Sequence, residues 1–145
     1  MATRKYGGAQ VFGLVLGATL VAAGILGFFY NSTFSSDESV RDAVLGILDV
    51  NAWHNLVHIG TGALTLLFAL RSESAARTWA LAFGVLYVVV AAWGFVIGSG
   101  ESILSIIPIN TEDSVLHLIL GLSGFAAYAL TAPRADRRQA ASATA

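Results

Sequence analysis

The stretch Ala9–Tyr30, AQVFGLVLGATLVAAGILGFFY, is 22 residues long and contains no charged residue. About 20 apolar residues in a helix cross the hydrocarbon core of a membrane, so this stretch predicts a membrane-spanning helix. Three further uncharged apolar runs follow, at Asn55–Leu70, Thr78–Gly98 and Val115–Thr131. With their polar flanks included, the predicted spans cover residues 9–30, 52–70, 78–98 and 113–131. The sequence therefore predicts an all-α fold, an integral membrane four-helix bundle.

The composition agrees with a chain whose main solvent is the lipid bilayer. Hydrophobic residues make up 56% of the 145 residues, charged residues make up 12%, and the mean hydropathy is +0.72. A soluble domain usually carries about 25% charged residues. The net charge of −1 offers no basic field for nucleic acid. The absence of cysteine excludes disulfides, thiolate metal sites and cysteine nucleophiles.

The basic residues predict the orientation, because cytoplasmic segments carry an excess of Lys and Arg. Seven of the eight fall on one side of the predicted spans: Arg4, Lys5, Arg71, Arg77, Arg134, Arg137 and Arg138. Arg41 alone falls on the other side. We therefore expect a multi-pass protein with both termini, and the loop between the second and third spans, in the cytoplasm.

The segments outside the spans predict surface elements and a tail. Within 31–50, the Ser36-Asp37-Glu38 sequence predicts the start of a short amphipathic helix on the outer membrane surface. Ile103–Ile107, followed by Pro108, predicts a shorter helix of the same kind. Residues 1–132 then form one transmembrane domain. The Ala/Ser/Arg-rich residues 133–145 predict a disordered cytoplasmic tail.

Two parts of the chain repeat one another. When Asn51 is placed over Asn110, His58 falls over His117 and Gly62 over Gly121 without a gap. The preceding spans echo one another as FGLVLGATLVAAG (12–24) and FGVLYVVVAAWG (83–94), with a shift of one residue. This pattern predicts two repeated helical hairpins, related by a pseudo-twofold axis along the membrane normal.

The start of each repeat unit carries the residues that could support chemistry. His54 and His58 lie one turn apart near the outer end of the second span, and Asp113 and His117 hold the matching positions in the fourth. Three imidazoles and a carboxylate are typical of a divalent metal site, with His54, His58, Asp113 and His117 as candidate ligands. Alternatively, His58 and His117 could bind a cofactor as the axial ligands of a b-type haem.

Two further interpretations remain open for this cluster. Histidines near the outer leaflet could take part in proton or quinone chemistry. They could also do no more than pin neighbouring helices together by hydrogen bonds. We find no serine nucleophile with a histidine and an acid at a diagnostic spacing, and no glycine-rich phosphate loop. The sequence therefore favours a non-enzymatic protein.

The same residues resemble a known family. The sequence N-x-x-H-N-L-V-H at Asn51–His58, the P-x-N at Pro108–Asn110 and the L-H-L around His117 are similar to the bacterial membrane proteins called domain of unknown function 4383. The resemblance covers residues 9–131. It implies a small four-helix protein of the bacterial plasma membrane, and it implies no activity. The family often has Asn where this chain has Ser114.

Together these observations predict a membrane protein whose outward-facing His/Asn/Asp cluster binds a metal, a haem or another small ligand. One alternative is a structural or partner-binding subunit. The other is a quinone- or haem-linked subunit of a membrane oxidoreductase. The expected partners are the lipid bilayer and either a second copy of the chain or another membrane protein.

Overall fold

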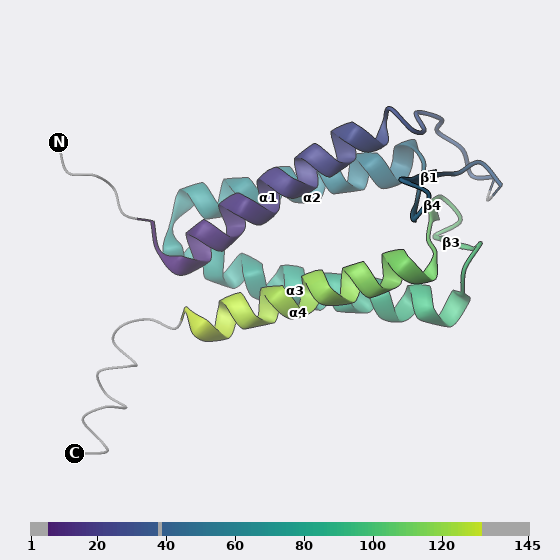
Figure 1. Cartoon of the computed structure of the whole chain (residues 1–145). Helices are drawn as coiled ribbons and strands as arrows, with labels where there is room; N and C mark the ends of the chain where they lie inside the picture. The colour runs from purple at the N-terminus through teal and green to yellow at the C-terminus, as the bar shows by residue number, and fades with distance from the viewer. Residues whose placement is uncertain (1–5, 38, 132–145) are drawn as a thin grey trace, which may run out of the picture.

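A computed structural model describes residues 6–37 and 39–131, and in this range the chain is mostly helical. Its four long helices are α1 (Gly8–Gly27), α2 (Ala52–Arg71), α3 (Glu73–Ile97) and α4 (Thr111–Leu130) (Figure 1). The start of α1 and the end of α4 lie at one end of the molecule, and the β-hairpins lie at the other. The predicted tail at 133–145 and the basic residues of both termini lie outside the described residues.

Three of the helices, α1, α3 and α4, are long and apolar enough to cross a membrane. Helix α2 has the same length as α1 and α4, 20 residues, but it falls outside that set. Its first turns carry the polar residues His54, Asn55 and His58. The predicted helical, membrane-protein character of the chain is confirmed at this level.

The helices pack closely in two pairs, α1 with α2 and α3 with α4 (Figure 1). Glycines allow the backbones to touch: a Cβ atom added to Gly62 would lie 2.8 Å from the carbonyl oxygen of Gly17. In the second pair, a Cβ on Gly121 would lie 3.1 Å from the carbonyl oxygen of Gly84. Small residues at such crossings are typical of packed membrane helices.

These contacts set a register that differs from the predicted one for the first helix of each pair. The sequence comparison placed Gly13 over Gly84, whereas the contacts make Gly17 the counterpart of Gly84. The difference is four residues, about one helical turn. The contacts follow the glycines that meet the partner helix, Gly17 and Gly84, and not the run of similar letters in the two sequences.

The two predicted surface helices are wrong, because both segments form β-hairpins. Strand β1 (Asp42–Val44) pairs antiparallel with β2 (Leu48–Val50), and β3 (Ser102–Ile103) pairs with β4 (Ile107–Pro108). The turns have positive φ at Leu45 (54°) and Gly46 (72°), and again at Leu104 (55°) and Ser105 (59°). Two successive positive φ angles are what a type I′ hairpin turn needs. Leu-Gly and Leu-Ser lack the usual Asn-Gly signal, so the apolar residues resembled a helix face.

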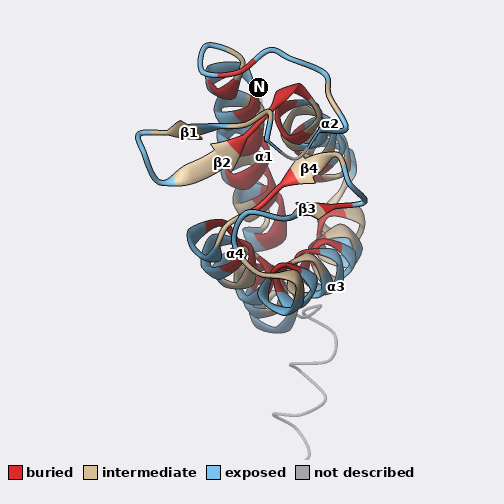
Figure 2. Cartoon of the chain, turned by 90° about the vertical axis from the view of Figure 1, so that its right-hand side faces the viewer, coloured by how far each residue is buried: buried red, intermediate tan, exposed pale blue. Residues whose placement is uncertain are grey.

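The hairpins cross over to the opposite helix pair. Strand β2 contacts α4, strand β4 contacts α2, and the two strands also contact one another. Seen from this end, both hairpins lie across the ends of the helices, and β2 and β4 each end in a buried residue (Figure 2). Each hairpin therefore covers the start of a helix that belongs to the other half of the chain.

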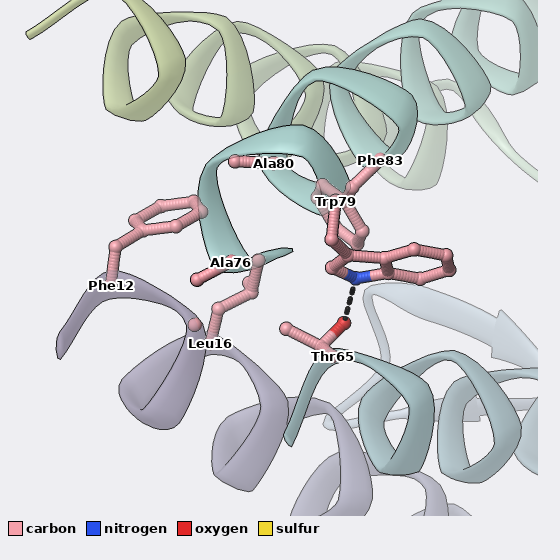
Figure 3. Close-up of a pocket in the computed structure, with 8 residues that line it drawn as sticks. Phe12, Leu16, Thr65, Ala76, Trp79, Ala80 and Phe83 are labelled. Atoms are coloured by element: carbon pink, nitrogen blue, oxygen red, sulfur yellow. Dashed lines mark hydrogen bonds between the residues drawn. The ribbon is translucent and has the colours of Figure 1, made fainter. Parts of the chain in front are cut away.

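Midway between the hairpin end and the opposite end of the molecule, the two helix pairs meet through an apolar core. Leu16 and Leu20 of α1 pack with Phe83 and Tyr87 of α3. Nearby, the Trp79 indole N–H donates a 2.8 Å hydrogen bond to the Thr65 hydroxyl of α2 (Figure 3). The hollow drawn in Figure 3 has no room for a water molecule. The pairs are thus tightly joined here, and the space between them lies at the hairpin end.

Glycine 62 gives a direct test of the helix contact. We expect Gly62→Ala to lower the free energy of unfolding in detergent by about 1–3 kcal/mol, because the new methyl group meets backbone atoms of α1. Gly60→Ala is the matched control on the same helix, since its Cβ meets nothing within 4 Å. A reversible unfolding assay should show no loss for the control. Equal loss for both variants would contradict the contact.

Candidate metal centre

Three histidines meet beneath the hairpins. His54 and His58 come from successive turns of α2, and His117 comes from α4. One ligand nitrogen from each ring lies within 4.8 Å of the other two. The ring centroids are 4.8 Å apart for His54 and His58, 5.9 Å for His54 and His117, and 6.0 Å for His58 and His117. The rings therefore form a compact triangle, which joins the two halves of the chain.

The histidine nitrogens are unusually short of partners. His54 and His117 are buried and His58 is half-buried. Three buried atoms, His54 Nε2, His58 Nδ1 and His117 Nδ1, have no hydrogen-bond partner within the described part of the chain. A buried polar atom left unpaired costs about 1–3 kcal/mol. Native proteins rarely keep several such atoms together unless they bind something.

The His54 ring is fixed by a hydrogen bond to the backbone. Its Nδ1 lies 2.8 Å from the carbonyl oxygen of Asp49. A carbonyl oxygen can only accept, so Nδ1 carries the proton and the neutral ring keeps a free lone pair on Nε2. A backbone carbonyl on one ring nitrogen is the usual way to orient a histidine that binds metal through the other.

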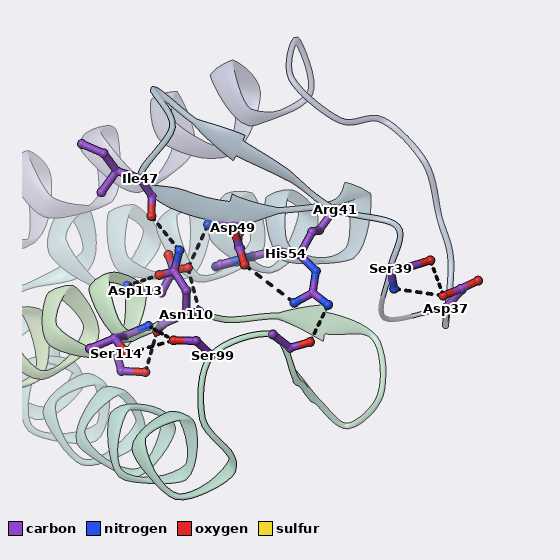
Figure 4. A network of polar contacts seen from close by, with 12 residues as sticks. Asp37, Ser39, Arg41, Ile47, Asp49, His54, Ser99, Asn110, Asp113 and Ser114 are labelled. Carbon is purple, nitrogen blue, oxygen red and sulfur yellow. Dashed lines mark hydrogen bonds and ion pairs between the residues drawn. The ribbon is translucent and has the colours of Figure 1, made fainter.

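Asp113 reaches the cluster indirectly. Its Oδ2 accepts hydrogen bonds from the backbone N–H of Asp49 (2.9 Å) and of Asn110 (3.3 Å) (Figure 4). The structure does not group Asp113 with the three converging histidine nitrogens. The Asp113 carboxylate of α4 instead accepts from the backbone N–H of Asp49 in β2, and the backbone carbonyl of the same residue accepts from His54 of α2. Sequence reasoning singled out Asp113 but could not find this connection, because the hairpin was not foreseen.

Two asparagines, one at the start of α2 and one at the start of α4, each connect a helix to the hairpin of the other half of the chain. Asn51 caps α2 by accepting from the His54 N–H, and its Nδ2 donates to the Ile106 carbonyl (2.7 Å). Asn110 caps α4 by accepting from the Asp113 N–H, and its Nδ2 donates to the Ile47 carbonyl (2.6 Å). The contacts are reciprocal. They fix both helix starts, and with them the depths of the histidines.

Two cavities flank the histidine triangle. The first, about 270 Å³, lies between α2, α3 and the β3–β4 hairpin, and the second, about 180 Å³, lies between α1, α4 and the β1–β2 hairpin. All three histidines line both cavities. Asp113 lines only the second, and among the described residues no Asp, Glu, Lys or Arg lines the first. The triangle therefore separates an uncharged cavity from one with an acid in its wall.

Tyr87 is a neighbour of the cluster that sequence reasoning missed. Its ring lies 5.4 Å from the His117 ring in an edge-on arrangement, and its hydroxyl is 3.1 Å from the Thr61 hydroxyl. Tyr87 also lines the first cavity. It also belongs to the apolar core between α1 and α3. Tyr87 lies at the depth of His58. The sequence could have indicated this only if the register of α3 against α2 had been known.

Comparison with known proteins gives one match. A family model described as Domain of unknown function (DUF4383) matches residues 10–130. No curated protein and no solved structure matches the chain.

The tautomer of His54 can be measured. In metal-free, nitrogen-15-labelled protein, we expect NMR correlations to place the His54 proton on Nδ1, because the Asp49 carbonyl accepts it. A His54→Gln variant assigns the signal. A proton on Nε2 instead would contradict the geometry described above.

The role of Asp113 in holding the hairpin can be tested by stability. We expect Asp113→Ala to lower the free energy of unfolding by about 1–3 kcal/mol, because the Asp49 and Asn110 N–H groups lose their acceptor. Glu112→Ala is the control, since this neighbouring acid is exposed. If both variants are equally stable, Asp113 does not hold the hairpin.

Proposed function

The chain belongs to the family that it matches, Domain of unknown function (DUF4383), and since that description states no activity, we propose a function from the geometry. The protein is a membrane protein that binds one transition-metal ion through His54, His58 and His117. The observation that carries this proposal is the convergence of one ring nitrogen from each of three histidines on two helices, in a cluster where each ring also has a buried nitrogen without a hydrogen-bond partner in the described residues.

The size of the triangle suits a single ion. Zinc binds histidine nitrogen at 2.0–2.1 Å, which separates tetrahedral ligands by about 3.4 Å. The ligand atoms here lie within 4.8 Å of one another, so rotation of the imidazoles by about 1 Å toward a common centre completes the geometry. Imidazole ligands suit zinc, copper, iron and nickel, and we take zinc as the reference ion. Three protein ligands leave a fourth position open, as in catalytic rather than structural zinc sites.

The triangle favours a single ion over a haem. A haem held by His58 and His117 needs its flat ring between the two imidazoles. The His54 ring lies 4.8 Å from His58 and 5.9 Å from His117, so it occupies part of the space that the haem ring would take. A small ion uses all three imidazoles and leaves the packing of the hairpins intact.

Asp113 has a positioning role in this proposal and is not a fourth ligand. The converging ligand atoms come from the three histidines, and Oδ2 of Asp113 already accepts from two backbone N–H groups. By holding the backbone of Asp49, whose carbonyl accepts from His54 Nδ1, it helps to fix the direction of His54 Nε2. Groups that orient a ligand in this way commonly change metal affinity 10- to 100-fold when removed.

A purely structural role for the histidines is less well supported. If they only pinned helices together, each ring would have its own hydrogen-bond partner. His54 has one, at Asp49, but the buried nitrogens of His58 and His117 have none in the described residues. The proposal therefore accounts for the atoms that a structural role leaves unpaired.

We place the protein in the bacterial plasma membrane with four crossings and both termini in the cytoplasm. Helices α1, α3 and α4 have the length and hydropathy to cross a membrane. We take α2 as the fourth crossing, because glycine contacts hold it alongside α1. Arg71 and Arg77 lie near the link between α2 and α3, at the end opposite the hairpins, and Arg41 lies at the hairpin end. The histidine triangle is then close to the outer surface.

We also propose that the chain arose by duplication of one α–hairpin–α unit. A shift of 59 residues, from Asn51 to Asn110, superposes the two reciprocal bonds, because it also carries Ile47 onto Ile106. A shift of 67, from Gly17 to Gly84, superposes the first helices. It carries Gln10, which donates to the Ala69 carbonyl, onto Arg77, which donates to the Tyr128 carbonyl. Each half thus repeats the other's contacts.

The metal proposal is tested by elemental analysis of protein purified in detergent after removal of any histidine tag. We expect about one transition-metal ion per chain in the wild type and a loss of at least 10-fold in His58→Ala and in His117→Ala. Tyr87→Phe is the control, because it keeps the ring against His117 and removes only the hydroxyl. Equal metal content in the wild type and both histidine variants, measured after dialysis against zinc, would contradict the proposal.

A further inference from the structure

The first cavity opens at the surface of the helices. Val57 of α2 and Val89 of α3 line it and are 43% and 54% exposed. Val89 lies well inside α3, which is apolar enough to cross a membrane, and Val57 lies in the second turn of α2, on a helix that also exposes Leu56 and Leu64. In a membrane, such a surface faces acyl chains. A molecule that enters the first cavity between α2 and α3 therefore comes from the lipid phase.

The charge balance around the proposed metal ion indicates the charge of that molecule. A divalent ion bound by three neutral imidazoles brings two positive charges into apolar surroundings, where uncompensated charge is costly. The Asp113 carboxylate, in the wall of the second cavity, offsets one of them. Among the described residues, the wall of the first cavity offers no further acid. One negative charge is therefore still needed, and the open position on the ion is the place for it.

The two cavities differ in charge, and this difference decides which of them suits an anionic molecule. They occupy equivalent positions in the proposed repeat. Val90 lines the first cavity at the position that corresponds to Ala23 in the second cavity. The second has the Asp113 carboxylate in its wall, which repels an anion. The first has an apolar wall and, at its inner end, the three histidines and Tyr87. An anionic group with an apolar tail therefore matches the first cavity better than the second.

We propose that the first cavity binds a long-chain monocarboxylate of the membrane, with its carboxylate on the open position of the metal and its alkyl chain leaving between α2 and α3. This inference rests on the proposed metal site. The carboxylate supplies the missing charge, and the apolar wall formed by Val57, Leu86, Val89 and Val90 contacts the chain. The protein would thus bind a fatty-acid-like molecule from the outer half of the bilayer.

The test uses full-length protein loaded with cobalt(II), whose visible absorption reports the ligands of the ion. Cobalt loading is measured first: failure to bind one ion per chain would overturn the metal site itself. With the ion bound, decanoate in an uncharged detergent should change the absorption saturably at one molecule per chain. Acetate has the charge without the tail, and decanol has the tail without the charge. Each should bind at least 100-fold more weakly than decanoate.

Two tryptophan variants locate the site. Val90→Trp fills the first cavity and should abolish the response to decanoate while cobalt loading stays at one per chain. Ala23→Trp, the matched substitution in the second cavity, should leave both unchanged. Val89→Trp, at the exposed mouth, should weaken decanoate binding with less risk to folding.

Three results would overturn the inference while leaving the metal site in place. If acetate binds as tightly as decanoate, the open position takes an anion from water. If decanol binds as tightly, charge does not select the ligand. If Ala23→Trp and Val90→Trp have equal effects in cobalt-loaded protein, the first cavity is not the binding site.

Discussion

Contact between glycine backbones is the constraint on which the other features of this protein depend. Where α1 meets α2, and where α3 meets α4, the main chains approach so closely that an added Cβ would lie 2.8 to 3.1 Å from a carbonyl oxygen of the partner glycine. A contact this close allows little sliding, so it fixes the depth of each helix. His58 and His117 lie four residues before Gly62 and Gly121. In each pair the same glycine contact therefore sets the depth of the histidine against the partner helix.

The hairpin end shows how a protein in apolar surroundings deals with its polar groups. The two asparagine caps use both ends of their amides, one on their own helix and one on the opposite hairpin. Asp113 occupies two backbone N–H groups at once. In the described part of the chain, three of the four buried side-chain atoms without a partner are imidazole nitrogens. This concentration of unpaired atoms at one point gives the histidine triangle its chemical interest.

The sequence predicted some of these features and not others, for physical reasons. Long apolar runs predicted the helices, because helix formation in lipid follows from composition. The repeat predicted that His58 and His117 would lie at one depth, because their spacing to glycine is the same. The hairpins could not be predicted, since Leu45 and Leu104 occupy a backbone conformation that leucine rarely adopts. The role of Asp113 depends on a hairpin and was out of reach for the same reason.

The crossing of the hairpins has a consequence for how the chain is assembled. A ribosome delivers α1, the first hairpin and α2 well before α4, and helices of a growing chain generally fold in the order of synthesis. Until α4 is made, the first hairpin has no Asn110 to donate to the Ile47 carbonyl. Asp113 is also missing, so nothing accepts from the N–H of Asp49, the residue whose carbonyl accepts from His54. The first half is thus an incomplete folding intermediate. When the second half is complete, the hydrogen bonds between the hairpins and the opposite helices form in both halves. Because each half covers the helix start of the other, neither half can complete its hairpin contacts alone.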